Sequence, residues 1–360
     1  GTSTTCVLRR GGALACFGSN VEGQMGFGEL RAHESAVDVV RDVRTVRPAA
    51  VAAPTRSVAM RAPSTPSIDA GDVHACFLGA NGRVHCWGGN GQGQLGDGTS
   101  VARGAPTEVL DLTNAVEIAA APSFTCARRG DGSVVCWGSS EGGLGTGRPS
   151  SSSRPVVVEG VRDAIGIGVG RRFVCVVHTN KGVSCFGAGT YGALGNGSYD
   201  DATHPVRIEG LTGVVEVRAG SAFACARHET GKVSCWGSNG EGTLGDGTTD
   251  PRSTPAPVVG LADAIDLDAY DTNVCAVRRN GRVVCWGDRR YGAIGDERAE
   301  RGPVSRPTEV VGVENAVEVT VGTSSACART AAGATFCWGG NLFGQAGVGV
   351  RCVAELEQFV

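Results

Sequence analysis

Fourteen of the fifteen cysteines fall in seven pairs, and the two cysteines of each pair are ten positions apart. Successive pairs recur about every 50 residues, although the first interval, from Cys6 to Cys76, is longer. A fixed period of this length indicates a chain built from one repeated supersecondary unit. The pairs are Cys6 with Cys16, Cys76 with Cys86, Cys126 with Cys136, Cys175 with Cys185, Cys225 with Cys235, Cys275 with Cys285, and Cys327 with Cys337.

Each repeat predicts four β-strands. An alternating stretch such as 116–120 precedes the cysteine pair and has the period of a half-buried strand. The cysteines then flank a hairpin turn such as Asn81-Gly82, and a Pro-led segment such as 155–158 suits an edge strand. We therefore expect an all-β fold, a seven-bladed β-propeller of four-stranded antiparallel blades, occupying residues 1–360 as a single domain.

The cysteine spacing also predicts disulfides. In a hairpin that turns at Asn81, residues 76 and 86 lie opposite each other, about 4.5–5.5 Å apart and within bridging range. We expect one disulfide per blade, joining each of the seven pairs, and an unpaired Cys352. Buried free thiols and a metal site are the alternatives, but no close CxxC spacing supports metal binding. Disulfides would place the chain in an oxidising compartment: secreted, on the cell surface or periplasmic.

Charge and hydropathy exclude two classes of partner. The formal net charge is −3, and the basic residues are spread thinly, so we expect no nucleic-acid binding. The longest apolar runs are far shorter than the ~18 residues that cross a bilayer, so no membrane span is expected.

The repeat resembles that of the regulator of chromosome condensation family. The fullest match runs from Val73-His74-Ala75-Cys76 through the segment 86–96, which reads CWGGNGQGQLG. This resemblance implies a seven-bladed propeller and covers nearly the whole chain. Members serve nucleotide exchange on a small GTPase, inhibition of β-lactamases and many bacterial roles. The eukaryotic exchange factor lacks the two cysteines per repeat, so we expect a bacterial-type member.

The two ends of the repeat array are irregular. The first repeat begins directly at its cysteine-bearing strand and carries an insertion at about 29–68, in which 37–43 and 50–53 could pair as an extra hairpin. That hairpin could dock a partner or form a loose surface flap. The tail 352–360 could supply the missing first strand of blade one, which we favour, or the last strand of blade seven.

No catalytic arrangement emerges from the spacing, so we expect no enzyme activity and no cofactor. The histidines fall at unrelated places, and His74 stands where other repeats have Phe124, Phe173 and Phe223, which indicates a packing residue. The glycine-rich segment 88–98 lacks the strand–loop–helix context of a phosphate loop.

An acidic cluster surrounds Tyr270. It consists of Asp263, Asp266, Asp268 and Asp271. Other repeats carry glutamate at the place of Asp266, so we interpret that position as solvated. Oxygen-ligated Ca²⁺ is an alternative for this cluster, but we predict no metal site.

The loops between the first and second strands differ in chemistry from one repeat to the next. A rigid scaffold that presents variable loops is typical of a recognition surface. As partner-binding residues we select Arg171, Arg172, Tyr270, Asp271 and Asp72; the alternative is that they are ordinary solvated loop residues. We expect a monomeric, non-enzymatic, extracytoplasmic scaffold that binds a protein partner. The alternatives are an exchange-type regulator of a small GTPase and an inhibitor of a secreted enzyme such as a β-lactamase.

Overall fold

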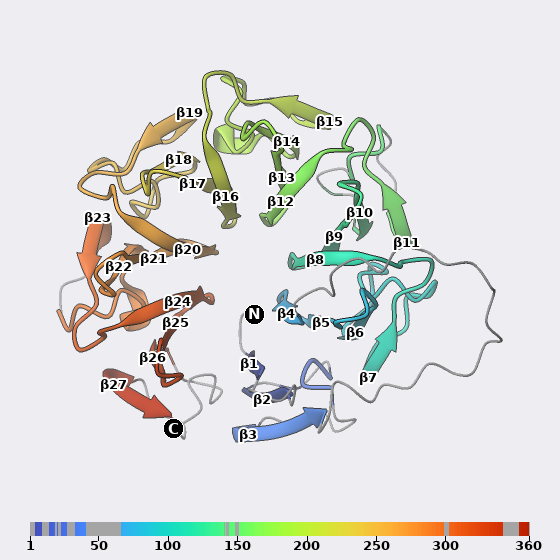
Figure 1. Ribbon diagram of the computed structural model, residues 1–360, viewed down its shortest axis with the longest axis horizontal. Helices are drawn as coiled ribbons and strands as arrows, with labels where there is room; N and C mark the ends of the chain where they lie inside the picture. Colours follow the sequence, from blue (N-terminus) through green and yellow to red (C-terminus); the bar gives the residue numbers. More distant parts are fainter. Residues whose placement is uncertain are drawn as a thin grey trace.

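Antiparallel sheets follow one another around a central channel (Figure 1). The computed structural model describes residues 4–8, 14–18, 20, 23–26, 33–40, 66–139, 141, 144–147, 151–298, 302–340 and 353–359. Cys352 and the segment 41–65 lie outside these residues, so the predicted free thiol and the 50–53 arm of the expected hairpin do too.

Six of the sheets are four-stranded blades, and in each the strands lie in chain order from the channel outward. Three blades contain β4 (Ser67–Ala70), β5 (His74–Leu78), β6 (Val84–Gly88) and β7 (Arg103–Glu108); β8 (Ala115–Ala120), β9 (Phe124–Arg129), β10 (Val134–Gly138) and β11 (Ser152–Val157); and β12 (Ala164–Val169), β13 (Phe173–His178), β14 (Val183–Gly187) and β15 (Ala202–Arg207). The other three contain β16 (Val214–Ala219), β17 (Phe223–His228), β18 (Val233–Gly237) and β19 (Arg252–Pro257); β20 (Ala264–Tyr270), β21 (Asn273–Arg278), β22 (Val283–Asp288) and β23 (Pro303–Glu309); and β24 (Ala316–Val321), β25 (Ser325–Thr330), β26 (Thr335–Gly339) and β27 (Val353–Phe359). Short 3₁₀ turns lie at η2 (Thr190–Gly192) and η3 (Arg290–Gly292).

The first sheet is different, and it makes the prediction of seven four-stranded blades wrong. It has only three strands among the described residues, β1 (Thr4–Leu8), β2 (Leu14–Gly18) and β3 (His33–Val40), in the order β1-β2-β3. The structure therefore has six complete blades and what we call the incomplete sheet. Among the described residues, no strand pairs with the channel side of β1, the strand that carries Cys6.

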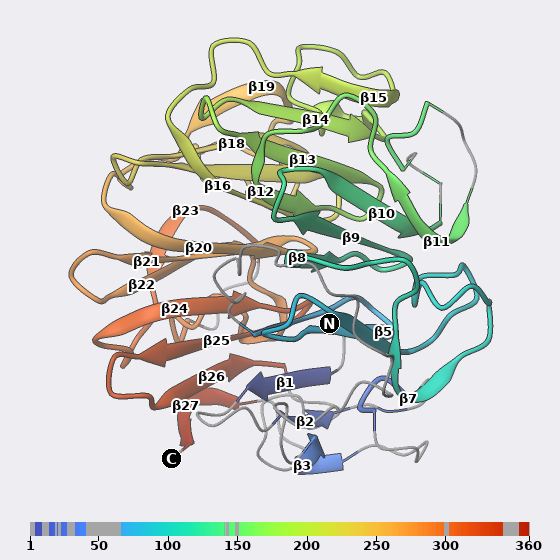
Figure 2. The same ribbon diagram turned by 45° about the vertical axis from the view of Figure 1, so that its right-hand side comes forward.

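The strands at the two ends of the repeat array, β27 and β3, do not pair as we expected. The tail strand β27 pairs with β26 and completes the last blade, so the favoured role of residues 352–360 as the first strand of blade one is wrong (Figure 2). Part of the 29–68 insertion forms β3, which pairs with β2, so residues 37–40 do not belong to an extra hairpin. Both strands begin 14 or 15 positions after the glycine that ends the preceding strand, as β7 does after Gly88 and β11 after Gly138, so the regular spacing of the repeat makes them outer strands.

All seven predicted disulfides are present, one in each blade and one in the incomplete sheet. In every case the two cysteines face each other across the hairpin with their Cα atoms 4.1 Å apart. The bridges lie in the core, where Cys76 and Cys86, for example, are fully buried. They join Cys6 to Cys16, Cys76 to Cys86, Cys126 to Cys136, Cys175 to Cys185, Cys225 to Cys235, Cys275 to Cys285, and Cys327 to Cys337.

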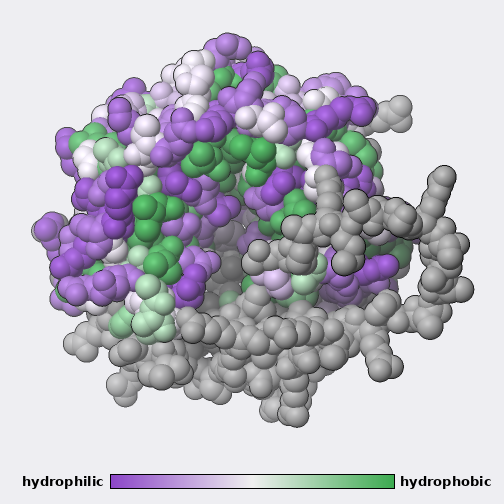
Figure 3. Space-filling model, viewed as in Figure 1, coloured by the Kyte–Doolittle hydropathy of each residue, from purple (hydrophilic) through white to green (hydrophobic). Residues whose placement is uncertain are grey.

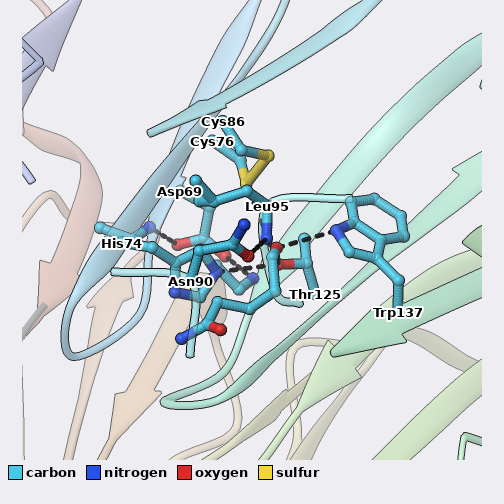
Figure 4. Close-up of a disulfide and its surroundings, with 11 residues drawn as sticks. Asp69, His74, Cys76, Cys86, Asn90, Leu95, Thr125 and Trp137 are labelled. Atoms are coloured by element: carbon cyan, nitrogen blue, oxygen red, sulfur yellow. Dashed lines mark hydrogen bonds between the residues drawn. A yellow bond between two sulfur atoms is a disulfide. The ribbon is translucent and has the colours of Figure 1, made fainter. Parts of the chain in front are cut away.

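In five of the six blades a buried tryptophan joins the blade to the repeat before it, and the blade with β14 has Phe186 at that place. The Trp137 Nε1–H donates to the Gln94 carbonyl at 2.8 Å (Figure 4). The Trp236 Nε1–H donates to the Ala193 carbonyl in the same way at 2.9 Å. Gly96 beside the Trp137 contact has φ +69°, and a Cβ there would lie 2.8 Å from the Trp137 Nε1. Only glycine fits, because both the backbone conformation and the space exclude a side chain.

Candidate protein-binding site at the mouth of the central channel

The turns from the inner to the second strand of each blade gather at one end of the channel. We call these the inner turns; they are residues 71–73, 121–123, 170–172, 220–222, 271–272 and 322–324. Most are closed by a short backbone hydrogen bond, such as that from the Gly220 N–H to the Phe223 carbonyl at 3.0 Å. A Cβ on Gly220 would lie 2.6 Å from the carbonyl oxygen of Asp271, so neighbouring inner turns touch each other. Among the described residues the six turns thus form a ring that is interrupted only at the incomplete sheet.

A pocket of about 100 Å³ lies inside this ring. Its lining includes Asp72, Arg171, Tyr270 and Asp271, which come from three different blades. Four of the five residues that we selected from the sequence are therefore brought together, although Asp72 and Tyr270 are 198 positions apart. The predicted propeller brings these turns to one face, but the pattern of the repeat does not show which of them meet at one pocket. A space-filling view shows how the molecule is hollowed at its centre (Figure 3).

Tyr270 and Asp72 connect two distant blades across the pocket. The Tyr270 hydroxyl donates a hydrogen bond to Asp72 Oδ1 at 2.5 Å. Burial raises the pKa of Tyr270 above its ordinary value, and the adjacent Asp72 carboxylate raises it further. The phenol therefore remains a hydrogen-bond donor at all physiological pH values.

Asp271 fastens its inner turn to that of the preceding blade. In this blade β20 extends to Tyr270, which pairs with Asn273, and Asp271 takes a left-handed conformation with φ 48°. The Ser221 hydroxyl donates to Asp271 Oδ1 at 2.6 Å, and the Ser221 N–H donates to the Asp271 carbonyl at 2.8 Å. These two bonds fix the loop that carries Tyr270 and Asp271.

The two adjacent arginines have different surroundings. Arg171 is exposed and lines the pocket, and its guanidinium has no ion pair among the described residues. Arg172 is also exposed, but its Nε and Nη2 donate to the Glu141 carbonyl at 2.8 and 2.6 Å. Arg172 therefore lies against the neighbouring blade and does not line the pocket.

Below the pocket the channel widens to a cavity of about 390 Å³ lined by the inner strands. Its charged residues include Asp69, Arg218 and Asp268. Arg218 Nη2 lies 2.9 Å from Glu216 Oε1, and Arg218 Nε lies 3.7 Å from Asp268 Oδ1. Burial raises the pKa of Asp268 to about 6, while the nearby Arg218 limits this shift. Burial likewise raises the pKa of Asp69.

Sequence reasoning missed the nature of this cavity. We interpreted the position of Asp266 as solvated, yet its Oδ2 accepts a hydrogen bond from the Val319 N–H at 2.8 Å. Burial, followed by the nearby Glu216, raises the pKa of Asp266 to about 7. Alternation alone identifies the face of a strand but does not show whether that face lines a narrow channel.

The acidic cluster does not converge on one point. Asp263 pairs with Arg278 at 2.9 Å, Asp266 and Asp268 bind backbone N–H groups of β24, and Asp271 accepts from Ser221. Within the described ranges, no group of three or more His, Cys, Asp or Glu side chains could hold a metal ion. No helix in the same part of the chain is long and apolar enough to cross a membrane.

Repeated four-stranded blades around a channel, with a ring of inner turns at its mouth, define a β-propeller. The chain belongs to the RCC1-like domain family, whose profile matches residues 14–357. The resemblance of its repeat to the regulator of chromosome condensation family is thereby confirmed.

Three solved structures illustrate the likeness in fold. Human WBSCR16 is 17% identical, with a TM-score of 0.80 over 96% of this chain and 93% of its own. Prp20p from Saccharomyces cerevisiae is 17% identical, with a TM-score of 0.78 over 97% of this chain and 84% of its own. The ectodomain of the Physcomitrella patens receptor kinase CR4 is 18% identical, with a TM-score of 0.54 over 94% of this chain and 71% of its own. A comparison with curated protein sequences found no match.

Proposed function

We propose that this chain is a non-enzymatic, extracytoplasmic scaffold that binds a protein partner through the ring of inner turns. The observation that carries the proposal is the convergence of Asp72, Arg171, Tyr270 and Asp271 on one pocket at the mouth of the channel. Arginine and tyrosine are the residues most often found at the energetic centres of protein interfaces.

The chemistry of the pocket suits recognition more than catalysis. Tyr270 and Asp72 are engaged with each other, and Asp271 is engaged with Ser221, so these groups are held in place in advance of binding. Such prior ordering lowers the entropy cost of association. Arg171 is left as an exposed cation at the rim, available to an acidic group of the partner.

The fold relatives and the disulfides support the two remaining parts of the proposal. The structure report on Prp20p describes its binding to Gsp1p and histones, which supports protein binding as the class of function. Seven disulfides in one chain favour an oxidising compartment. The ectodomain of CR4 provides a related fold in an extracellular setting.

Affinity capture from the surface fraction of the native organism tests the proposal. The wild-type chain is compared with Arg171→Glu and with Arg207→Glu, a matched control whose arginine is exposed on the outer strand β15 of the same blade. We expect the wild type and the control to retain the same protein, while Arg171→Glu retains at least tenfold less, as for loss of an interface hot spot worth about 1.4 kcal/mol or more. Equal recovery with all three baits would exclude the pocket as the binding site.

A further inference from the structure

Two tyrosines occupy equivalent positions in two blades and are largely exposed. Tyr191 lies in η2, between β14 and β15, and Tyr291 lies in η3, between β22 and β23; they are 60% and 58% exposed (Figure 1). Both take a left-handed backbone conformation, with φ 59° and 63°. The equivalent residues of two other blades, Gln92 and Glu241, do not. A bulky residue in this conformation is strained, and such strain collects at binding sites.

The turn with Tyr291 supplies its own basic residues. Residues 288–301 contain four carboxylates and four arginines, so their formal charges cancel. Arg290, directly before the tyrosine, donates from Nε to Asp288 Oδ2 at 2.7 Å. The turn with the other tyrosine has Thr190 in place of this arginine.

The turn with Tyr191 is acidic. The equivalent residues 188–201 contain two aspartates, Asp200 and Asp201, and no lysine, arginine or histidine, so their formal charge is −2. Both aspartates are exposed. Within the described part of the chain, neither aspartate forms an ion pair with a basic side chain. The same turn geometry therefore carries an unbalanced negative charge in this blade.

A second exposed tyrosine lies beside this turn. Tyr199 is 58% exposed and comes directly before Asp200. A Cβ on Gly189 would collide with the Asp200 carbonyl, so the backbone that carries Tyr199 packs against the residue that precedes η2. The Gly189 N–H also donates to Asp201 Oδ1 at 2.9 Å. These contacts hold the two tyrosine-bearing segments together.

We call Tyr191, Tyr199 and Asp200 the aromatic patch. The Ser198 hydroxyl donates to Asp200 Oδ2 at 2.7 Å, and the Asp200 N–H donates to Ser198 Oγ at 3.0 Å. These two bonds fix the carboxylate relative to its own loop. The patch thus presents two aromatic rings and an oriented carboxylate to solvent.

The aromatic patch belongs to the same face as the inner turns. The Ala188 N–H, at the start of this segment, donates to the Arg172 carbonyl at 2.9 Å. Arg171, the exposed cation at the rim of the pocket, is the adjacent residue of that inner turn. A protein held by the inner turns can therefore reach the patch as well.

We propose that the aromatic patch receives an arginine side chain of the partner protein. A guanidinium is planar, stacks on aromatic rings and donates hydrogen bonds to a carboxylate. Its charge is complementary to that of residues 188–201, whereas the turn with Tyr291 already contains arginines of its own. The partner thus offers a basic group to the patch and an acidic group to Arg171. This inference rests on the proposed function, because the arginine belongs to the protein that the inner turns hold.

A synthetic peptide provides the test. The probe is a fluorescein-labelled peptide of glycine, serine and arginine, and its control has citrulline, which is neutral and similar in shape, in place of each arginine. Binding to the full chain is measured by fluorescence anisotropy at low ionic strength, where screening is weak. We expect saturable binding of the arginine peptide and at least fivefold weaker binding of the citrulline peptide.

Matched protein variants locate the bound peptide. Tyr191→Gly removes the ring and suits the left-handed backbone, so the variant should unfold at the same urea concentration as the wild type or a higher one. We expect it to bind the arginine peptide about threefold more weakly, as for one lost cation–π contact at an exposed site. Asp200→Asn should weaken binding by a similar factor. The matched control Tyr291→Gly should leave binding unchanged, because its turn carries no net charge.

Three outcomes would overturn the proposal. They are absence of saturable binding, equal affinity for the arginine and citrulline peptides, and equal losses in Tyr191→Gly and Tyr291→Gly. The last would mean that the peptide is attracted to the acidic surface in general. The peptide assay requires neither the native partner nor Arg171, so its failure is distinguishable from failure of the affinity capture that tests the proposed function.

Discussion

His74 illustrates how one residue can differ between otherwise equivalent blades. It is fully buried where other blades have phenylalanine, as its place in the repeat predicts. Its Nε2–H donates to Thr125 Oγ1 at 2.8 Å, and the Thr125 hydroxyl in turn donates to the Gln94 carbonyl (Figure 4). Burial lowers the pKa of His74 to about 3, so the imidazole is neutral in the folded protein.

This buried histidine predicts a specific loss of stability in acid. Below the unfolded pKa of about 6.5 the unfolded chain binds a proton that folded His74 does not, so stability falls as the pH decreases. From pH 7.5 to pH 5 the free energy of unfolding of the wild type should fall by about 2 kcal/mol more than that of His74→Phe, because phenylalanine does not titrate. Urea unfolding at both pH values measures this difference. Identical pH dependence of the two proteins would show that His74 takes up its proton at the same pH in the folded and the unfolded chain.

In one hairpin turn, the residue types alone indicate the wrong residue for the left-handed conformation. In most hairpins a glycine such as Gly82, with φ 75°, takes the left-handed conformation that the turn requires. In the hairpin of β13 and β14 the sequence Lys181-Gly182 suggests that Gly182 does so, yet Lys181 has φ 60° instead. The backbone hydrogen bond from the Lys181 N–H to the His178 carbonyl matches that of Gly82 to Gly79, so position in the turn decides the conformation.

At the scale of elements, the strands next to the cysteines were predictable and the inner strands only partly so. The cysteine-bearing strands are joined by tight turns, so their register follows from local sequence. Whether a polar inner-strand residue such as Asp266 faces solvent or a neighbouring strand depends on the next blade, about 50 residues away. The pocket was partly predictable, because the propeller brings its turns to one face, but the direct contact of Tyr270 with Asp72 across the channel was not.

Arg218 is the cation beside the carboxylates of the channel, and its removal should lower the free energy of unfolding by an amount that depends on pH. At pH 8, Arg218→Met leaves the Asp268 and Asp266 carboxylates without their cation and should lower the free energy of unfolding by about 1–2 kcal/mol. This loss is smaller than for a fully buried ion pair because the Arg218 side chain is 37% exposed. The folded pKa values of these carboxyls, about 6 and 7, lie above the unfolded value. Protonation on going to pH 5 therefore favours the folded state, and the defect should shrink.

Urea unfolding of the wild type, Arg218→Met and the exposed-residue control Arg207→Met at pH 8 and 5 provides the measurement. A defect of equal size at both pH values would mean that Arg218 contributes through packing alone.

At the scale of the whole molecule, ring closure is where prediction from the sequence failed. The repeat indicated a propeller and located its disulfides, because both follow from patterns within about 50 residues. The place of β27 follows from the spacing of the repeat, since Val353 comes 14 positions after Gly339 as Ser152 comes 14 positions after Gly138, and the prediction did not apply that spacing to the tail.

The seven disulfides predict the thiol content of the whole chain and test the compartment. Each bridge closes a short hairpin and should contribute about 2.5–3 kcal/mol in the chain-entropy model. With fifteen cysteines and fourteen in bridges, titration of the native-purified protein in denaturant without reductant should find about one thiol per chain. The same titration after full reduction should find about fifteen. If about fifteen thiols react before reduction, the protein resides in a reducing compartment, and an intracellular exchange-type regulator becomes the better interpretation of its fold.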